Sequence, residues 1–130
     1  MYLPTIAYDT YIISVPVLKA HSLADITGTL KNMMGFLPPE HYQRGGHWKK
    51  AAFHADIHRA IIELNRYVTP NLTLLDARIG LAEYHLGGAE CNPHVCKLIA
   101  GFNPLAVDRK AAELLGLNPD GIPHLAVERG

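Results

Sequence analysis

The chain has 130 residues, of which 48% are hydrophobic and 18% charged, and 12 basic residues balance 12 acidic ones. This composition is typical of a globular domain, and the zero formal charge excludes a global field that would recruit nucleic acid or an anionic membrane. No apolar stretch is long enough to span a bilayer, and the N-terminus lacks the basic region and cleavage site of a signal peptide. We therefore expect one cytoplasmic domain over residues 1–130.

The first predicted strand is Tyr11–Leu18, a run of β-branched and apolar residues typical of a strand covered on both faces. Pro16 has no amide proton, which places it at the end of the strand or at a bulge. The polar stretch Lys19–Gly35 follows directly. Within it, Thr27-Gly28-Thr29 predicts a helix start, and the helix is continued by apolar residues at helical spacing: Leu30, Met33, Met34 and Leu37.

Residues 38–52 predict a loop, either a mobile lid or a loop anchored on the domain by aromatic side chains. The strongest helical periodicity follows, from Ala51 to Val68, and Pro70 ends it. His54 and His58 lie four positions apart on this predicted helix.

The second half of the chain predicts a strand at Leu72–Leu75, with Asp76 at its carboxyl end, and a strand at Lys97–Phe102. Asn103-Pro104 predicts a helix start, the helix continues through Leu115, and a last short helix is expected at Ile122–Glu128. Strands that alternate with helices predict an α/β domain with a small, mainly parallel sheet and helices packed on it. So small a sheet suggests either a truncated form of a larger α/β domain or pairing with a second copy.

The main candidate site is the predicted helix start, because its unpaired amides and the helix dipole favour an anion. Thr27, Thr29, Lys31 and Asn32 would bind an anionic small molecule there, together with Lys19. The alternative is that Thr27 only caps the helix and the lysines are solvated.

Three further polar residues complete this candidate site. His21 is a candidate proton carrier, or else bonds backbone groups in its turn. Asp76 would lie opposite, where open α/β sheets place their ligands. Asp108 would bind the ligand or orient a lysine. The alternative is that it has no function and is only a carboxylate favoured near a helix start.

A second hypothesis is a metal site at His54 and His58, since two histidines four apart on a helix can ligate zinc. The protease pattern requires glutamate after the first histidine, and Ala55 stands there. A third ligand would come from a loop residue: His41, His47, Glu83 or Cys91. Cys91 and Cys96 lack the spacing of redox or zinc-ribbon pairs, so we expect reduced thiols.

Several segments resemble the domain of unknown function 362 family. These are VLKAHSLADITGTLKNMMGFLP, HADIHRAIIELN, LTLLDARIGL and LIAGFNPLAVDRKAAELLGL, in the family's order. The chain is similar to the C-terminal two-thirds of the family domain; a preceding lysine-proline-asparagine segment is missing, and a loop that usually ends in glycine-proline reads GGAECNPHVC.

The resemblance implies bacterial or archaeal proteins sometimes fused to ferredoxin-type iron–sulfur modules, hence a redox context. This chain has no four-cysteine motif, so we expect no self-contained iron–sulfur cluster, and the cofactor stays unknown. The expected partners are an anionic small molecule and either a second copy or a ferredoxin-like protein, without nucleic acid or membrane. A third hypothesis is a non-catalytic module that a protein partner completes.

Overall fold

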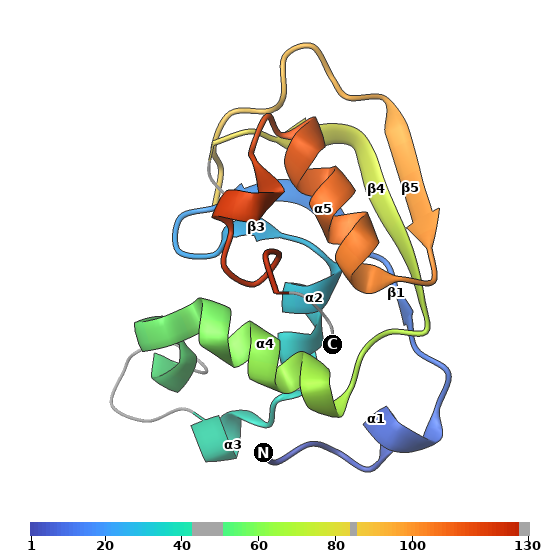
Figure 1. Ribbon diagram of the computed structural model, residues 1–130, viewed down its shortest axis with the longest axis vertical. Helices are drawn as coiled ribbons and strands as arrows, with labels where there is room; N and C mark the ends of the chain where they lie inside the picture. Colours follow the sequence, from blue (N-terminus) through green and yellow to red (C-terminus); the bar gives the residue numbers. More distant parts are fainter. Residues whose placement is uncertain (43–50, 84–85, 128–130) are drawn as a thin grey trace.

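The computed structural model describes residues 1–42, 51–83 and 86–127, and places its main helices on one side of a five-stranded sheet (Figure 1). The long strand β4 (Leu72–Leu81) is central. It pairs in parallel with β1 (Ile13–Ser14) and β2 (Val17–His21), and antiparallel with β5 (Lys97–Gly101). The strand β3 (Asp25–Thr27) pairs antiparallel with β2. The expected α/β class is confirmed.

The helical layer contains α2 (Thr29–Asn32), which continues as the 3-10 turn η1 (Met33–Phe36), together with α4 (Ile57–Tyr67) and α5 (Pro104–Leu114). Short elements complete it: α1 (Ile6–Asp9), α3 (Pro39–Tyr42) and the 3-10 turns η2 (Ala51–Asp56) and η3 (Pro119–Gly121). None of the helices in the described ranges is long and apolar enough to cross a membrane.

The core lies between the sheet and these helices. Its largest fully buried apolar side chains come from all parts of the chain: Leu18, Ile26, Met33, Leu37, Ile61, Leu64, Leu75 and Leu125. The segment after η3 runs between α4 and β3 (Figure 1), which brings Leu125 into this core. Residues far apart in the sequence are thereby held together.

The strand β4 is longer than predicted. The sequence predicts a strand at Leu72–Leu75 that ends at Asp76, whereas β4 continues to Leu81. Thr73, Leu75 and Ala77 are buried against the helices, whereas Leu74 and Arg78 are exposed on the other face. This period of two continues through Asp76, so a carboxylate on the exposed face does not interrupt the strand. Asp76 therefore lies in the middle of β4, and its predicted place at a strand end was wrong.

Pro16 separates two strands where the sequence predicted one. β1 ends at Ser14, β2 begins at Val17, and the register against β4 shifts between Val17 and Lys19. Because proline cannot donate to a ladder, the prediction of a strand end or bulge is confirmed.

The helix predicted at Ile122–Glu128 was wrong in the part that the structure describes. Residues 122–127 form turns, in which the amides of Leu125 and Ala126 both donate to the carbonyl of Ile122. By contrast, α5 begins and ends where expected, with Asn103 accepting from the amide of Ala106 and with Gly116 at φ +77° after its end.

Candidate functional site

The start of α2 is bonded to a carboxylate of the protein itself. Asp108 on α5 is fully buried; its Oδ1 accepts from the amide of Thr29 at 2.7 Å and its Oδ2 from the amide of Leu30 at 2.9 Å. The sequence correctly located a helix start that attracts negative charge. These two amides, however, are engaged by Asp108 and are not open to an external anion.

Gly28 makes this arrangement possible. A Cβ at position 28 would collide with the Asp108 carboxylate. Glycine between the two threonines therefore lets a side chain from a distant helix reach the first amides of α2. This explains physically why glycine occupies this position.

Two predicted ligand-binding side chains have structural contacts instead. Thr29 is fully buried, and its Oγ1 shares a hydrogen bond of 2.9 Å with Oγ1 of Thr73 on β4. Asn32 donates through Nδ2 to Oγ of Ser14 on β1 at 3.1 Å. Both side chains thereby fasten α2 to the sheet.

The pKa of Asp108 is raised from 3.8 to about 7, because the effect of burial exceeds the opposing effect of the hydrogen bonds from Leu30 and Thr29. Desolvation outweighs these bonds, and no side-chain cation in the described part of the chain contributes to the shift. Asp108 is consequently a titratable group in the physiological range, placed between α5 and α2.

The hairpin of β2 and β3 carries three more of the predicted residues. Lys19 lies directly opposite Thr27, whose buried Oγ1 has no hydrogen-bond partner among the described residues. His21 accepts from the amides of Leu23 and Ala24 through Nδ1, each at 3.1 Å. These contacts match the backbone-bonding alternative for His21.

A chain of three titratable side chains lies where the turn between β2 and β3, the first turn of α4 and the C-terminal segment meet. Nδ1 of His58 is 2.8 Å from Nδ1 of His124, and Nε2 of His58 is 3.5 Å from Oδ2 of Asp25. The rings of the two histidines stack with centroids 5.1 Å apart. Asp25 has a left-handed backbone with φ +62°, which aspartate tolerates better than most residues.

His124 is the buried end of this chain. Only 3% of its surface is exposed, and its Nε2 has no hydrogen-bond partner in the described parts of the protein. Burial, together with smaller electrostatic effects of His58 and Lys31, lowers the pKa of His124 from 6.5 to about 4. His124 is therefore neutral near pH 7, with one ring nitrogen protonated and the other a proton acceptor.

The metal hypothesis rested on His54 and His58 sharing one helix, and this premise was wrong. His54 belongs to the 3-10 turn η2, and the non-helical backbone of Asp56 (φ −148°, ψ 76°) separates it from α4, where His58 lies. Asp56 instead caps α4 by accepting from the amide of Arg59. In residues 1–42, 51–83 and 86–127, no group of three or more His, Cys, Asp or Glu side chains is placed to hold a metal ion.

Other predicted residues lie apart from this site. Asp76 forms an ion pair with Arg78 on the exposed face of β4, and hydrogen bonds from Arg78 lower the pKa of Asp76 to about 2. Asp76 thus has a cation of its own and does not face the start of α2. Cys91 and Cys96 are free thiols, one buried and one exposed, and of the proposed loop ligands His47 lies outside the described residues.

Sequence reasoning missed Asp25 and His124. His124 and His58 are 66 positions apart, and no local pattern indicates that their rings meet. Their contact depends on the path of the C-terminal segment across α4.

Residues 1–113 match the family described as a domain of unknown function (DUF362). No curated protein and no solved structure matches the chain.

Proposed function

Since the chain belongs to the family described as a domain of unknown function (DUF362), we propose its activity from the geometry: it binds a small anion and exchanges a proton with it through His124 and His58. The observation that carries the proposal is the buried Nε2 of His124, which has no partner among the described residues. A buried nitrogen of this kind ordinarily has a hydrogen-bond partner, so a ligand or a water is expected at it.

The contacts favour one arrangement of protons when both rings are neutral. A carboxylate only accepts, so Nε2 of His58, which faces Asp25, carries a proton. Nδ1 of neutral His58 is then an acceptor and receives the proton of Nδ1 of His124. Nε2 of His124 is consequently unprotonated, with a lone pair available to a ligand.

Proton transfer through this chain is balanced. A ligand proton passes to Nε2 of His124 while the proton on Nδ1 of His124 passes to Nδ1 of His58. His58 becomes an imidazolium whose charge faces Asp25, and His124 remains neutral throughout. This route suits the low pKa of His124, because a lasting positive charge on that buried ring is unfavourable.

Lys31 supplies the positive charge that favours an anion. Its ammonium is close enough to contribute to the lowered pKa of His124, so an anion bound beside His124 would be stabilised by it. The anionic ligand expected from the sequence is retained, and its proposed position moves from the amides of α2 to His124 and Lys31. A redox setting with a ferredoxin-like partner remains a prediction of the family resemblance.

Phosphate and sulfate test the proposal directly, because phosphate carries an exchangeable proton near neutral pH and sulfate does not. We expect phosphate to shift the ring ¹⁵N resonances of His124 and His58 at millimolar concentration. His124→Gln should weaken phosphate binding about tenfold, since it removes one hydrogen bond to a charged ligand. His94→Gln is the matched control, because His94 is exposed and pairs only with Glu90 among the described residues.

Two outcomes would contradict the proposal. If phosphate leaves the ring resonances of His58 and His124 unchanged, it does not bind beside these two rings. Equal effects of phosphate and sulfate would show that charge alone is recognised and that no proton is exchanged.

A further inference from the structure

We propose that the uncovered face of the sheet is the contact surface between two copies of this chain. The helices pack on the other face of the sheet (Figure 1), and no described helix covers this one. The inference is independent of the chemistry proposed for His58 and His124.

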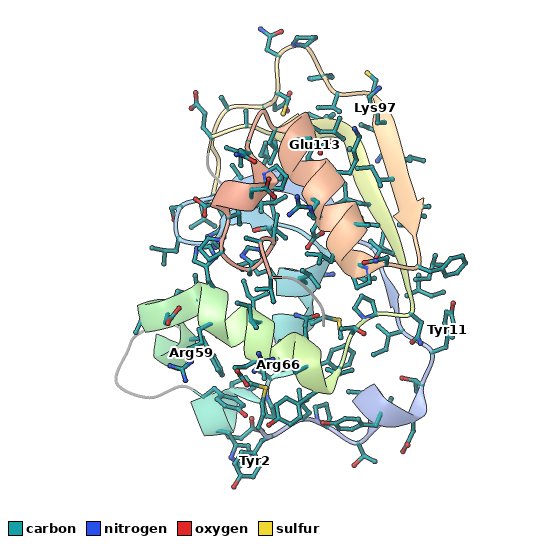
Figure 2. The ribbon with its side chains drawn as sticks, in the orientation of Figure 1. Tyr2, Tyr11, Arg59, Arg66, Lys97 and Glu113 are labelled. Carbon is teal, nitrogen blue, oxygen red and sulfur yellow. The ribbon has the colours of Figure 1, made fainter. Side chains whose placement is uncertain are left out.

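The open face, as we call it, is defined by strand register. Val17, Asp76 and Leu98 form one row across β2, β4 and β5, and Leu74 lies opposite Ala100. Ile13 pairs with Leu72, two residues before Leu74, so it lies on the same face. Tyr11, Val15 and Phe102 lie outside the strands, but each is two residues from Ile13 or Ala100 along the chain. Its large hydrophobic members are Tyr11, Ile13, Val15, Val17, Leu74, Leu98 and Phe102, with exposed fractions between 40% and 77%. Figure 2 shows Tyr11 beside the start of β1 and Lys97 at the start of β5, at opposite ends of the sheet.

The area of the open face fits a dimer. Fully exposed side chains of this size present about 150–200 Å² each, so the observed fractions amount to roughly 700 Å² per chain. Two copies would bury about 1,400 Å², within the range of about 1,200–2,000 Å² found for stable interfaces. A monomer rarely leaves so large an apolar patch in water.

The charges favour a second copy over a charged partner. The carboxylate of Asp76 is already paired with Arg78 at 2.7 Å, so the open face presents no unbalanced charge there. The whole chain has zero formal charge, so two copies do not repel each other. The open face therefore carries one neutralised ion pair, Asp76 with Arg78, among apolar side chains, and such a face can be self-complementary under a two-fold axis, as an isologous dimer requires.

The expected dimer is a sandwich of two sheets packed face to face, with the helices outside. Such sheets pack about 10 Å apart with their strands roughly aligned. In each chain of the dimer, the helices then cover one face of the sheet and the sheet of the second copy covers the other. A sheet with two apolar faces requires such cover on both.

The test is the molar mass of the full chain measured by sedimentation over a wide range of concentration. The wild type is expected to be a dimer at micromolar concentration. Leu98→Lys and Ile13→Lys place a charge at either end of the open face and should raise the dimer dissociation constant about 100-fold or more. Tyr67→Lys is the matched control, because Tyr67 is 51% exposed but lies on α4, on the helical side.

A third variant guards against a folding defect. Val15→Thr combined with Val17→Thr keeps β-branched side chains in the sheet and should still weaken the dimer at least about tenfold. Circular dichroism must show the wild-type fold for each variant that is compared. A wild-type chain that is monomeric at every concentration would overturn the proposal. This holds even if the monomer binds a different protein. Equal dissociation constants for Leu98→Lys and Tyr67→Lys would overturn it too.

Discussion

Oδ1 of Asp108 lies 2.7 Å from the amide nitrogen of Thr29, although the two residues are 79 positions apart. The bond joins the ITGTLKN and NPLAVDRKA segments, both within stretches that resemble the family. One carboxylate thereby holds α5 against the first turn of α2, and its removal should have a large effect.

Asp108→Ala should lower the free energy of unfolding by about 2–5 kcal/mol, because two buried amides would lose their acceptor. Chemical denaturation monitored by circular dichroism measures this change. Asp120→Ala is the control: Asp120 is an exposed carboxylate paired with Arg109, and its loss should cost about 0–1 kcal/mol. Similar losses for both variants would contradict a special role for Asp108.

Gly28→Ala should destabilise the protein by about 1–3 kcal/mol, because the new Cβ would collide with the Asp108 carboxylate. The control is Gly35→Ala, where a Cβ meets no atom within 4 Å. Combining Gly28→Ala with Asp108→Ala tests the cause, since the methyl group has no carboxylate to meet in the double variant. The two losses should therefore be less than additive, and full additivity would refute the steric explanation.

Thr29 and Thr73 allow a similar double-variant test. Thr29→Val alone leaves the buried hydroxyl of Thr73 without its described partner, at a cost of about 1–3 kcal/mol. Replacing both by valine removes both polar groups at nearly constant volume and should be close to neutral. Denaturation midpoints measure both changes, and a double variant less stable than either single one would show that the hydroxyl pair stabilises the fold.

The pH dependence of stability should contain two opposing contributions. The pKa of Asp108 is raised from 3.8 to about 7 by folding, so its contribution is present below pH 4 and is lost as the pH rises to about 7. The pKa of His124 is lowered from 6.5 to about 4, so its contribution is present above pH 6.5 and is lost as the pH falls to about 4. These amount to about 4 and about 3 kcal/mol and largely cancel.

Single variants separate the two contributions. Between pH 4 and pH 7, His124→Gln should make stability fall with rising pH relative to the wild type, and Asp108→Asn should make it rise. Urea titrations at closely spaced pH values provide the comparison. If either variant follows the wild-type pH profile, the corresponding group does not titrate as the structure indicates.

The predictions of helix starts and strand breaks were accurate where the residues that cause them are adjacent in the sequence. Asn103-Pro104 before an apolar helical pattern located α5, and Pro16 located the break between β1 and β2. The glycine and threonines before Leu30 located the start of α2. The prediction that the strand ends at Asp76 was wrong because a charged side chain suggests a strand end. It did not take into account Arg78, which pairs with Asp76 on the same face of β4.

The sequence by itself determined the α/β class, the bounds of α5, the break at Pro16 and the stretch whose helix start attracts a carboxylate. Only the tertiary structure decided that this carboxylate is Asp108 and that His58 meets His124 instead of sharing a helix with His54. The physical reason is that propensity, capping and periodicity act over a few residues. Side-chain pairs separated by 66 or 79 positions form only when packing of the whole core brings their elements together.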